Sequence, residues 1–151
     1  MSRSRTVRSS LASSALLAFV ACGGPFLLLP GGALDGDVAP APARWDAVGD
    51  AGTAQLETNA ADPYSVNVAY TVVDGRLYVN AGDTETRWAR HIAGDPRVRL
   101  RVDGALYALR AERVTAAGEI ASFAEAWTAQ SIFRRDPRGL DAVWLFRMEP
   151  R

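Results

Sequence analysis

The chain has 151 residues and a formal net charge of zero, with 17 basic residues that are all arginine, one histidine and one cysteine. The absence of lysine excludes Schiff-base catalysis, the single cysteine excludes a disulfide within the chain, and the single histidine excludes a multi-histidine metal site. A Ser-His-Asp triad is formally available, but no nucleophile-elbow motif accompanies it. We therefore expect no metal site and assign no catalytic side chain.

The N-terminal part of the chain carries a long apolar segment. Residues 11–34 contain no charged side chain, and Arg3, Arg5 and Arg8 precede them. As a helix, Leu11 to Leu29 would span roughly 28 Å, which is close to the thickness of a bilayer's hydrocarbon core. By the positive-inside rule the arginines stay in the cytoplasm. The pattern predicts an apolar helix within residues 1–34, as a membrane anchor or signal segment, and an extracytoplasmic domain held at the inner membrane.

Three fates of this segment agree with the sequence. It is a retained anchor, a signal peptide cleaved near Gly31-Gly32-Ala33, or a lipoprotein signal with Cys22 as the lipid-attachment site. Val20-Ala21-Cys22-Gly23 resembles a lipoprotein signal, although Phe19 stands where leucine is usual. In all three cases the domain lies outside the cytoplasm.

Residues 35–43 (DGDVAPAPA) are rich in proline and alanine and predict a short linker, followed by one domain over residues 44–151. Asp74-Gly75 and Asp103-Gly104 are typical of two-residue hairpin turns. Apolar and β-branched residues predict six strands: Gln55–Thr58, Tyr64–Val73, Arg76–Asn80, Arg97–Val102, Ala105–Val114 and Ala142–Glu149.

Two helices are expected between the strands. The first covers Thr84–Ala93 and ends at Gly94 and Pro96, and the second begins after Thr115 and continues to about Gln130. In the second helix Ile120, Phe123, Ala124 and Trp127 fall at helical spacing and are expected to face the core. The pattern favours an α+β fold: a small, mostly antiparallel six-stranded β-barrel with helical covers.

These residues resemble the flavin-binding split barrel of the pyridoxamine 5′-phosphate oxidase-like proteins, and within it the deazaflavin-dependent nitroreductase family. The resemblance covers roughly residues 53 to 151. It rests on Leu56-Glu57-Thr58, on Val73-Asp74-Gly75-Arg76-Leu77-Tyr78-Val79, on Trp88-Ala89-Arg90-His91-Ile92-Ala93-Gly94-Asp95-Pro96-Arg97-Val98, and on Leu145-Phe146-Arg147-Met148-Glu149-Pro150.

The resemblance implies FMN or a deazaflavin coenzyme in a groove beside the barrel, with its phosphate-bearing tail near the end of the third strand and the following helix. The implied cofactor-binding residues are Asn80, Ala81, Gly82, Thr84, Thr86, Arg87, Trp88 and His91. Trp88 favours the deazaflavin type, since flavin-type members usually carry lysine there, whereas His91 replaces the family's usual asparagine. Gly82 and a helix N-terminus also suit an anionic ligand, while Asp83 and Glu85 disfavour one.

Two functions remain open. The first is a membrane-tethered reductase that transfers hydride from a flavin or deazaflavin to a hydrophobic small-molecule acceptor, a quinone or a nitro compound. The second is a non-catalytic split barrel that binds a ligand or partner at the cell envelope. Split barrels commonly pair, so a homodimer is expected in either case.

The remaining arginines favour structural roles. From Asp35 onward acids outnumber arginines, so no nucleic-acid partner is expected. Arg97, Arg99 and Arg101 alternate along one strand face, which suits either an anionic ligand or, as we favour, acids on neighbouring strands. We expect Trp127 and Trp144 to anchor the core, and Arg134, Arg135 and Arg138 to lie on the solvated surface.

Overall fold

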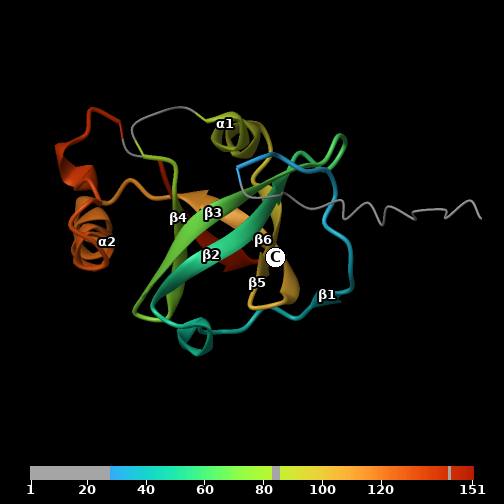
Figure 1. Cartoon of the computed structure of the whole chain (residues 1–151), viewed down its shortest axis with the longest axis horizontal. Helices are drawn as coiled ribbons and strands as arrows, with labels where there is room; N and C mark the ends of the chain where they lie inside the picture. Colours follow the sequence, from blue (N-terminus) through green and yellow to red (C-terminus); the bar gives the residue numbers. More distant parts are fainter. Residues whose placement is uncertain (1–27, 83–85, 143) are drawn as a thin grey trace, which may run out of the picture.

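The computed structural model describes residues 28–82, 86–142 and 144–151, which form a sheet with a helix at either side (Figure 1). In chain order the elements are β1 (Val38–Ala39), β2 (Ala51–Thr58), β3 (Tyr64–Val73), β4 (Arg76–Asn80), α1 (Arg87–Gly94), β5 (Arg97–Val102), β6 (Ala105–Arg113), α2 (Ala117–Ala129) and β7 (Leu145–Pro150). In this part of the chain, no helix has the length and apolar character needed to cross a bilayer.

The sheet closes on itself as a barrel. Its strand order is β1-β6-β5-β2-β3-β4-β7, and β7 also pairs with β6, which completes the ring. The pairs among β2 to β7 are antiparallel, whereas β1 lies parallel to β6. The predicted six-stranded antiparallel barrel with two helices is confirmed. The predicted N-terminal apolar helix falls mainly on residues 1–27, outside the described residues.

Both predicted hairpin turns have the backbone that their Asp-Gly sequences favour. Asp74 and Gly75 have φ values of 52° and 78°, and Asp103 and Gly104 have φ values of 52° and 82°. Positive φ at both central residues is the type I′ geometry, whose twist matches that of the flanking strands. These two local turns fix the register of β3 with β4 and of β5 with β6.

The barrel interior is filled by alternate residues of its strands. On β3, Val68, Tyr70 and Val72 are buried in this core, and Val66 packs against it, as the alternation predicts. Trp45, which precedes the first barrel strand, is buried in the same cluster. Tyr78, in contrast, is buried outside the barrel interior, on the outer face of β4 against α2.

The two helices occupy separate places on the barrel. In α2, Phe123 and Ala124 are buried, and Ile120 and Trp127 pack against the same cluster, which confirms the predicted apolar face. The helix begins at Ala117, with Ala116 rather than Thr115 as its N-cap. The other helix, α1, begins at Arg87 among the described residues and ends at Gly94, one residue beyond the predicted end.

Residues 31–39 lie against the barrel, although part of this segment has the composition of a linker. Gly31 exchanges two backbone hydrogen bonds of 2.9 Å with Ser65 at the start of β3. Leu34 is only 1% exposed, and its backbone N–H donates to Glu57 Oε2 at 2.6 Å. Val38 and Ala39 then pair with β6. We call residues 31–39 the N-terminal strap.

Candidate functional site

A cavity of about 250 Å³ opens at the carboxyl end of β4. Its lining combines aromatic and aliphatic side chains with two guanidinium groups: Asn80, Gly82, Trp127, Phe133, Arg134, Arg135 and Leu140. Two segments far apart in the sequence therefore form it, the end of β4 and the loop between α2 and β7. Among the described residues, no carboxylate or imidazole belongs to this lining.

The β4 wall of the cavity is a tight local turn. The Gly82 backbone N–H donates to Asn80 Oδ1 at 2.9 Å, so the asparagine side chain folds the chain back just after the strand. Gly82 has a φ of 73°, which favours glycine, and no described atom lies within 4 Å of where a Cβ would stand. The backbone here is open to close approach by a ligand.

The opposite wall is organised by Trp127, near the C-terminal end of α2. Its indole Nε1 donates to the carbonyl of Arg135 at 3.1 Å, and the Arg134 guanidinium carbon lies 3.6 Å from its ring centroid. Partial burial lowers the pKa of Arg134, because its charged form loses hydration. Among the described residues no carboxylate pairs with this guanidinium. An anionic ligand would supply the missing counter-charge.

The α1 part of the predicted site lies apart from this cavity. Thr86 is the N-cap of α1 but makes no capping hydrogen bond, and its buried Oγ1 has no partner among the described residues. The Arg87 guanidinium carbon lies 4.4 Å from the Tyr64 ring centroid. Trp88 is buried in the core against Phe146. Thr86 alone of these offers an unsatisfied donor.

His91 contacts β2 and β3. Its Nδ1 lies 2.9 Å from Thr58 Oγ1, and its ring packs edge-to-face on Tyr64 with centroids 5.4 Å apart. Burial lowers the pKa of His91, and the nearby Arg87 and Arg90 lower it further. The imidazole is therefore neutral at pH 7, a hydrogen-bonding group between α1 and the barrel.

The structure thus divides the eight residues of the predicted site. Asn80 and Gly82 line the cavity, whereas Ala81 between them packs on the core and donates its N–H to the Trp144 carbonyl at 2.9 Å. Thr84 lies outside the described residues. Sequence reasoning missed the wall contributed by Trp127, Phe133, Arg134, Arg135 and Leu140. A phenylalanine beside two arginines in a loop was the available signal.

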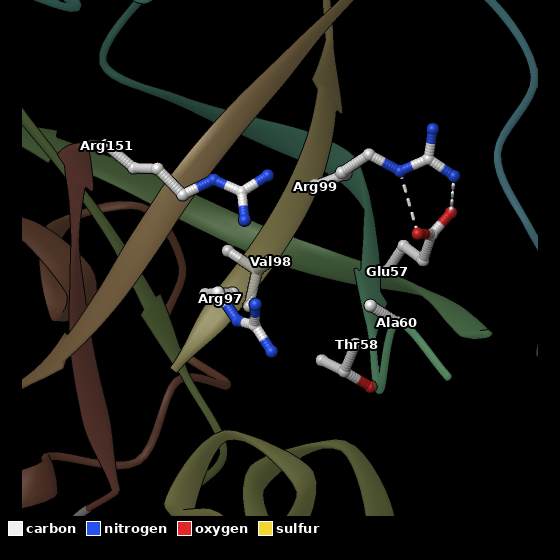
Figure 2. Close-up of a pocket in the computed structure, with 7 residues that line it drawn as sticks. All are labelled: Glu57, Thr58, Ala60, Arg97, Val98, Arg99 and Arg151. Carbon is white, nitrogen blue, oxygen red and sulfur yellow. Dashed lines mark hydrogen bonds and ion pairs between the residues drawn. The ribbon is translucent and has the colours of Figure 1, made fainter. Parts of the chain in front are cut away.

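Of the β5 arginines, Arg99 pairs with an acid on a neighbouring strand, as favoured from the sequence, whereas Arg97 and Arg101 have partners of other kinds. Figure 2 shows Arg99 turned toward Glu57, to which it donates hydrogen bonds of 2.7 and 2.5 Å. Arg97 pairs with Asp95 at 2.7 Å, and Arg101 donates to Gln55 at 3.0 Å. The cavity drawn in Figure 2, which also has Arg151 in its lining, holds only about 70 Å³. This volume excludes a flavin.

A further cavity of about 270 Å³ lies between α1, β6 and β7. It is lined mainly by Pro96, Arg110, Ala111, Glu112, Arg113, Trp144 and Phe146. The Arg113 guanidinium carbon lies 4.3 Å from the Trp144 ring centroid, and the carboxylate of Glu112 is already in the lining. The cavity at the end of β4 suits an anion better, because its described lining contains no acid.

No protein-family model and no curated protein sequence matches the chain. Among solved structures, a candidate pyridoxamine 5′-phosphate oxidase from Listeria innocua superposes with a TM-score of 0.51 at 14% identity, over 66% of this chain and 83% of that one. An FAD-binding protein from Mesorhizobium loti superposes with a TM-score of 0.50 at 19% identity, over 66% of this chain and 78% of that one. The chain therefore has the split-barrel fold of the pyridoxamine 5′-phosphate oxidase-like and FAD-binding proteins.

Proposed function

We propose that this chain is a membrane-tethered reductase that holds FMN or a deazaflavin and reduces a hydrophobic acceptor, a quinone or a nitro compound. The observation that carries the proposal is the cavity at the end of β4, where aromatic surface and open backbone meet the Arg134 guanidinium, which pairs with no carboxylate of the described residues. The split-barrel fold supports it, since similar structures include an FAD-binding protein.

The described residues fit the phosphate-bearing tail of such a cofactor, since the cavity's volume of about 250 Å³ is smaller than the roughly 300–1,000 Å³ of sites that hold a whole cofactor. Gly82 leaves open the space that a Cβ would fill, so the backbone N–H groups of this turn are accessible to a phosphate. Arg134 supplies positive charge for the anionic tail, and Phe133 and Leu140 supply apolar surface.

In this proposal the protein contributes binding and orientation rather than proton transfer. A reduced flavin or deazaflavin, when bound, supplies a hydride, which together with a proton from solvent converts a quinone to its hydroquinone. The described lining of the cavity offers arginine, aromatic and aliphatic side chains, which hold charge and exclude water. Tethering at the bilayer would bring a lipid-soluble acceptor close to this cavity.

The test is cofactor binding by the full chain in detergent. Titration with FMN, FAD and a deazaflavin, followed by flavin fluorescence, should show saturable binding of one of them. Arg134→Gln should weaken that binding about tenfold, because one charge-assisted hydrogen bond is lost. Arg138→Gln is the matched control, since Arg138 lies in the same loop, outside the cavity lining, and pairs with Asp136 at 2.6 Å.

Two further measurements locate the cofactor and test the reaction. Arg87→Ala should also weaken binding if the α1 residues hold part of the cofactor, and unchanged affinity would confine the site to the β4 cavity. Reoxidation of the bound, reduced cofactor by a soluble quinone reports the reaction. Absence of binding by all three compounds would overturn the reductase and leave the non-catalytic binding module as the function.

A further inference from the structure

The loop after α2 presents two large apolar side chains almost completely to solvent. Ile132 is 93% exposed and Phe133 is 89% exposed. In the part of the chain that the structure describes, the other exposed large apolar residues are Leu28, Leu29 and Val38, all in the N-terminal segment. Two adjacent side chains of this size outside the core mark a surface that meets an apolar partner.

Hydrogen bonds hold the backbone of this loop, so the exposure of Ile132 and Phe133 follows from the loop's conformation. The N–H of Phe133 donates to Ser131 Oγ at 3.2 Å, and the N–H of Arg134 donates to the Ser131 carbonyl at 3.0 Å. Trp127 Nε1 holds the Arg135 carbonyl at 3.1 Å. We call residues 131–135 the apolar turn. Ile132 and Phe133 project from it.

Arginine directly follows the two apolar residues. Among the described residues the guanidinium of Arg134 pairs with no carboxylate, whereas Arg138 pairs with Asp136. Exposed apolar side chains flanked by arginine are the combination that binds the interface of an anionic bilayer, where acyl chains and phosphate groups meet.

The apolar segment near the start of the chain agrees with such a partner. Leu28 and Leu29 are exposed and end the apolar run of the uncharged segment 11–34. Figure 1 shows the chain that follows α2 beside that helix, at the left of the view. The segment predicted to enter the membrane and the apolar turn thus both present large apolar side chains to solvent.

We propose that the apolar turn is a membrane-contact element that inserts Ile132 and Phe133 into the interface of an anionic bilayer. Arg134, whose guanidinium lies on Trp127 at the cavity, adds electrostatic attraction toward the anionic surface. Because Phe133 also lines the cavity at the end of β4, the cavity mouth faces the bilayer, which gives a lipid-soluble acceptor direct entry. This last consequence rests on the proposed function, whereas the membrane contact itself does not.

The experiment places an environment-sensitive probe on the apolar turn of the full chain. Ile132→Cys in a Cys22→Ser background is labelled with a nitrobenzoxadiazole dye and reconstituted into phosphatidylcholine vesicles with or without phosphatidylglycerol. Val38→Cys is the matched control, since Val38 is also an exposed apolar residue and lies in β1, on the side of the view opposite α2 in Figure 1. Lipids with a spin label near the headgroup serve as quenchers.

With phosphatidylglycerol present, the dye at residue 132 should be quenched at least about twofold more than the dye at residue 38, and its emission should shift to the blue. Adding Phe133→Ser should remove most of this difference. Equal quenching at the two positions would overturn the proposal. So would protection of residue 132 in detergent that grows with protein concentration, because a second copy would then cover the apolar turn. Cofactor titration of the same samples reports on the proposed function separately.

Discussion

Glu57 shows how a single buried charge is held within the sheet. Its side chain is only 6% exposed and accepts hydrogen bonds from the Arg99 guanidinium and from the backbone of Leu34. Glu57→Gln keeps the shape but turns an amide NH₂ toward one of these donors, which leaves a buried donor without an acceptor. We expect a loss of about 2 kcal/mol in the free energy of unfolding, measured by urea denaturation at pH 7.

The control is Asp95→Asn. Asp95 pairs with Arg97, which lies on β5 like Arg99, but this ion pair is much more exposed to solvent. Its effect on the urea midpoint should be much smaller, as for other surface ion pairs. Equal losses in the two variants would mean that burial of Glu57 adds nothing to the strength of its interactions.

Single residues were predictable where the signal was local. The Asp-Gly turns specify their own backbone, and Val68, Tyr70 and Val72 follow from strand alternation. The wall of the cavity formed by Trp127 and Arg134 was not predictable, because both were interpreted from their own segments, as core and as surface. They reach the end of β4 only because α2 packs on the barrel, a contact that no short sequence pattern encodes.

Among the elements, α2 is attached to the barrel by an ionic cluster as well as by its apolar face. Glu119, in its first turn, accepts from the Tyr78 hydroxyl at 2.8 Å and from Arg147 at 2.6 Å. Arg147 also pairs with Glu112 at 2.8 Å and with Glu149. Burial and the neighbouring Glu119 raise the pKa of Tyr78 to about 12, so its hydroxyl remains a donor at neutral pH.

This cluster predicts an acid-sensitive docking of α2. Burial alone would raise the pKa of Glu119, but hydrogen bonds from Arg147 and Tyr78 outweigh it and hold the pKa below its ordinary 4.5. A depressed carboxyl pKa stabilises the fold above pH 4.5, and this stabilisation is lost as the pH falls through the folded-state value. Hydrogen exchange of α2 amides should therefore accelerate below pH 4.5, relative to β3 amides. Glu119→Gln should already accelerate it at pH 7 and flatten its pH dependence; an unchanged profile would contradict this role.

The elements themselves were largely predictable, since six strands and two helices follow from periodicity and turn residues. Their ends were less so: β2 begins at Ala51 rather than Gln55, because its first residues pair with β3 despite their small, weakly apolar side chains. β1 was not predicted, because two residues in a proline-rich segment carry no strand pattern. It forms only because the barrel offers the edge of β6.

For the whole molecule, the N-terminal strap moves the start of the folded unit toward the apolar segment. The sequence predicted a linker over residues 35–43, but Val38 and Ala39 within it pair with β6. The residues before it are also held on the barrel, since Leu34 is 1% exposed and Gly31 pairs with Ser65. A retained anchor would leave almost no free chain between the bilayer and the barrel. The barrel would then sit directly on the membrane surface, which is the arrangement that contact through residues 131–135 requires.

The N-terminal strap also predicts how the domain tolerates truncation. A chain beginning at residue 44, the start predicted from composition, loses the burial of Leu34 and its hydrogen bond to Glu57. Compared with a chain beginning at residue 28, its free energy of unfolding in urea should be lower by about 3 kcal/mol, of which apolar burial contributes about 2. Leu34→Ala in the longer chain should reproduce most of this loss, whereas Val38→Ala, at a half-exposed position, should change it little. If the two truncated chains were equally stable, the N-terminal strap would contribute nothing to the stability of the barrel. A retained anchor could then hold the domain away from the bilayer.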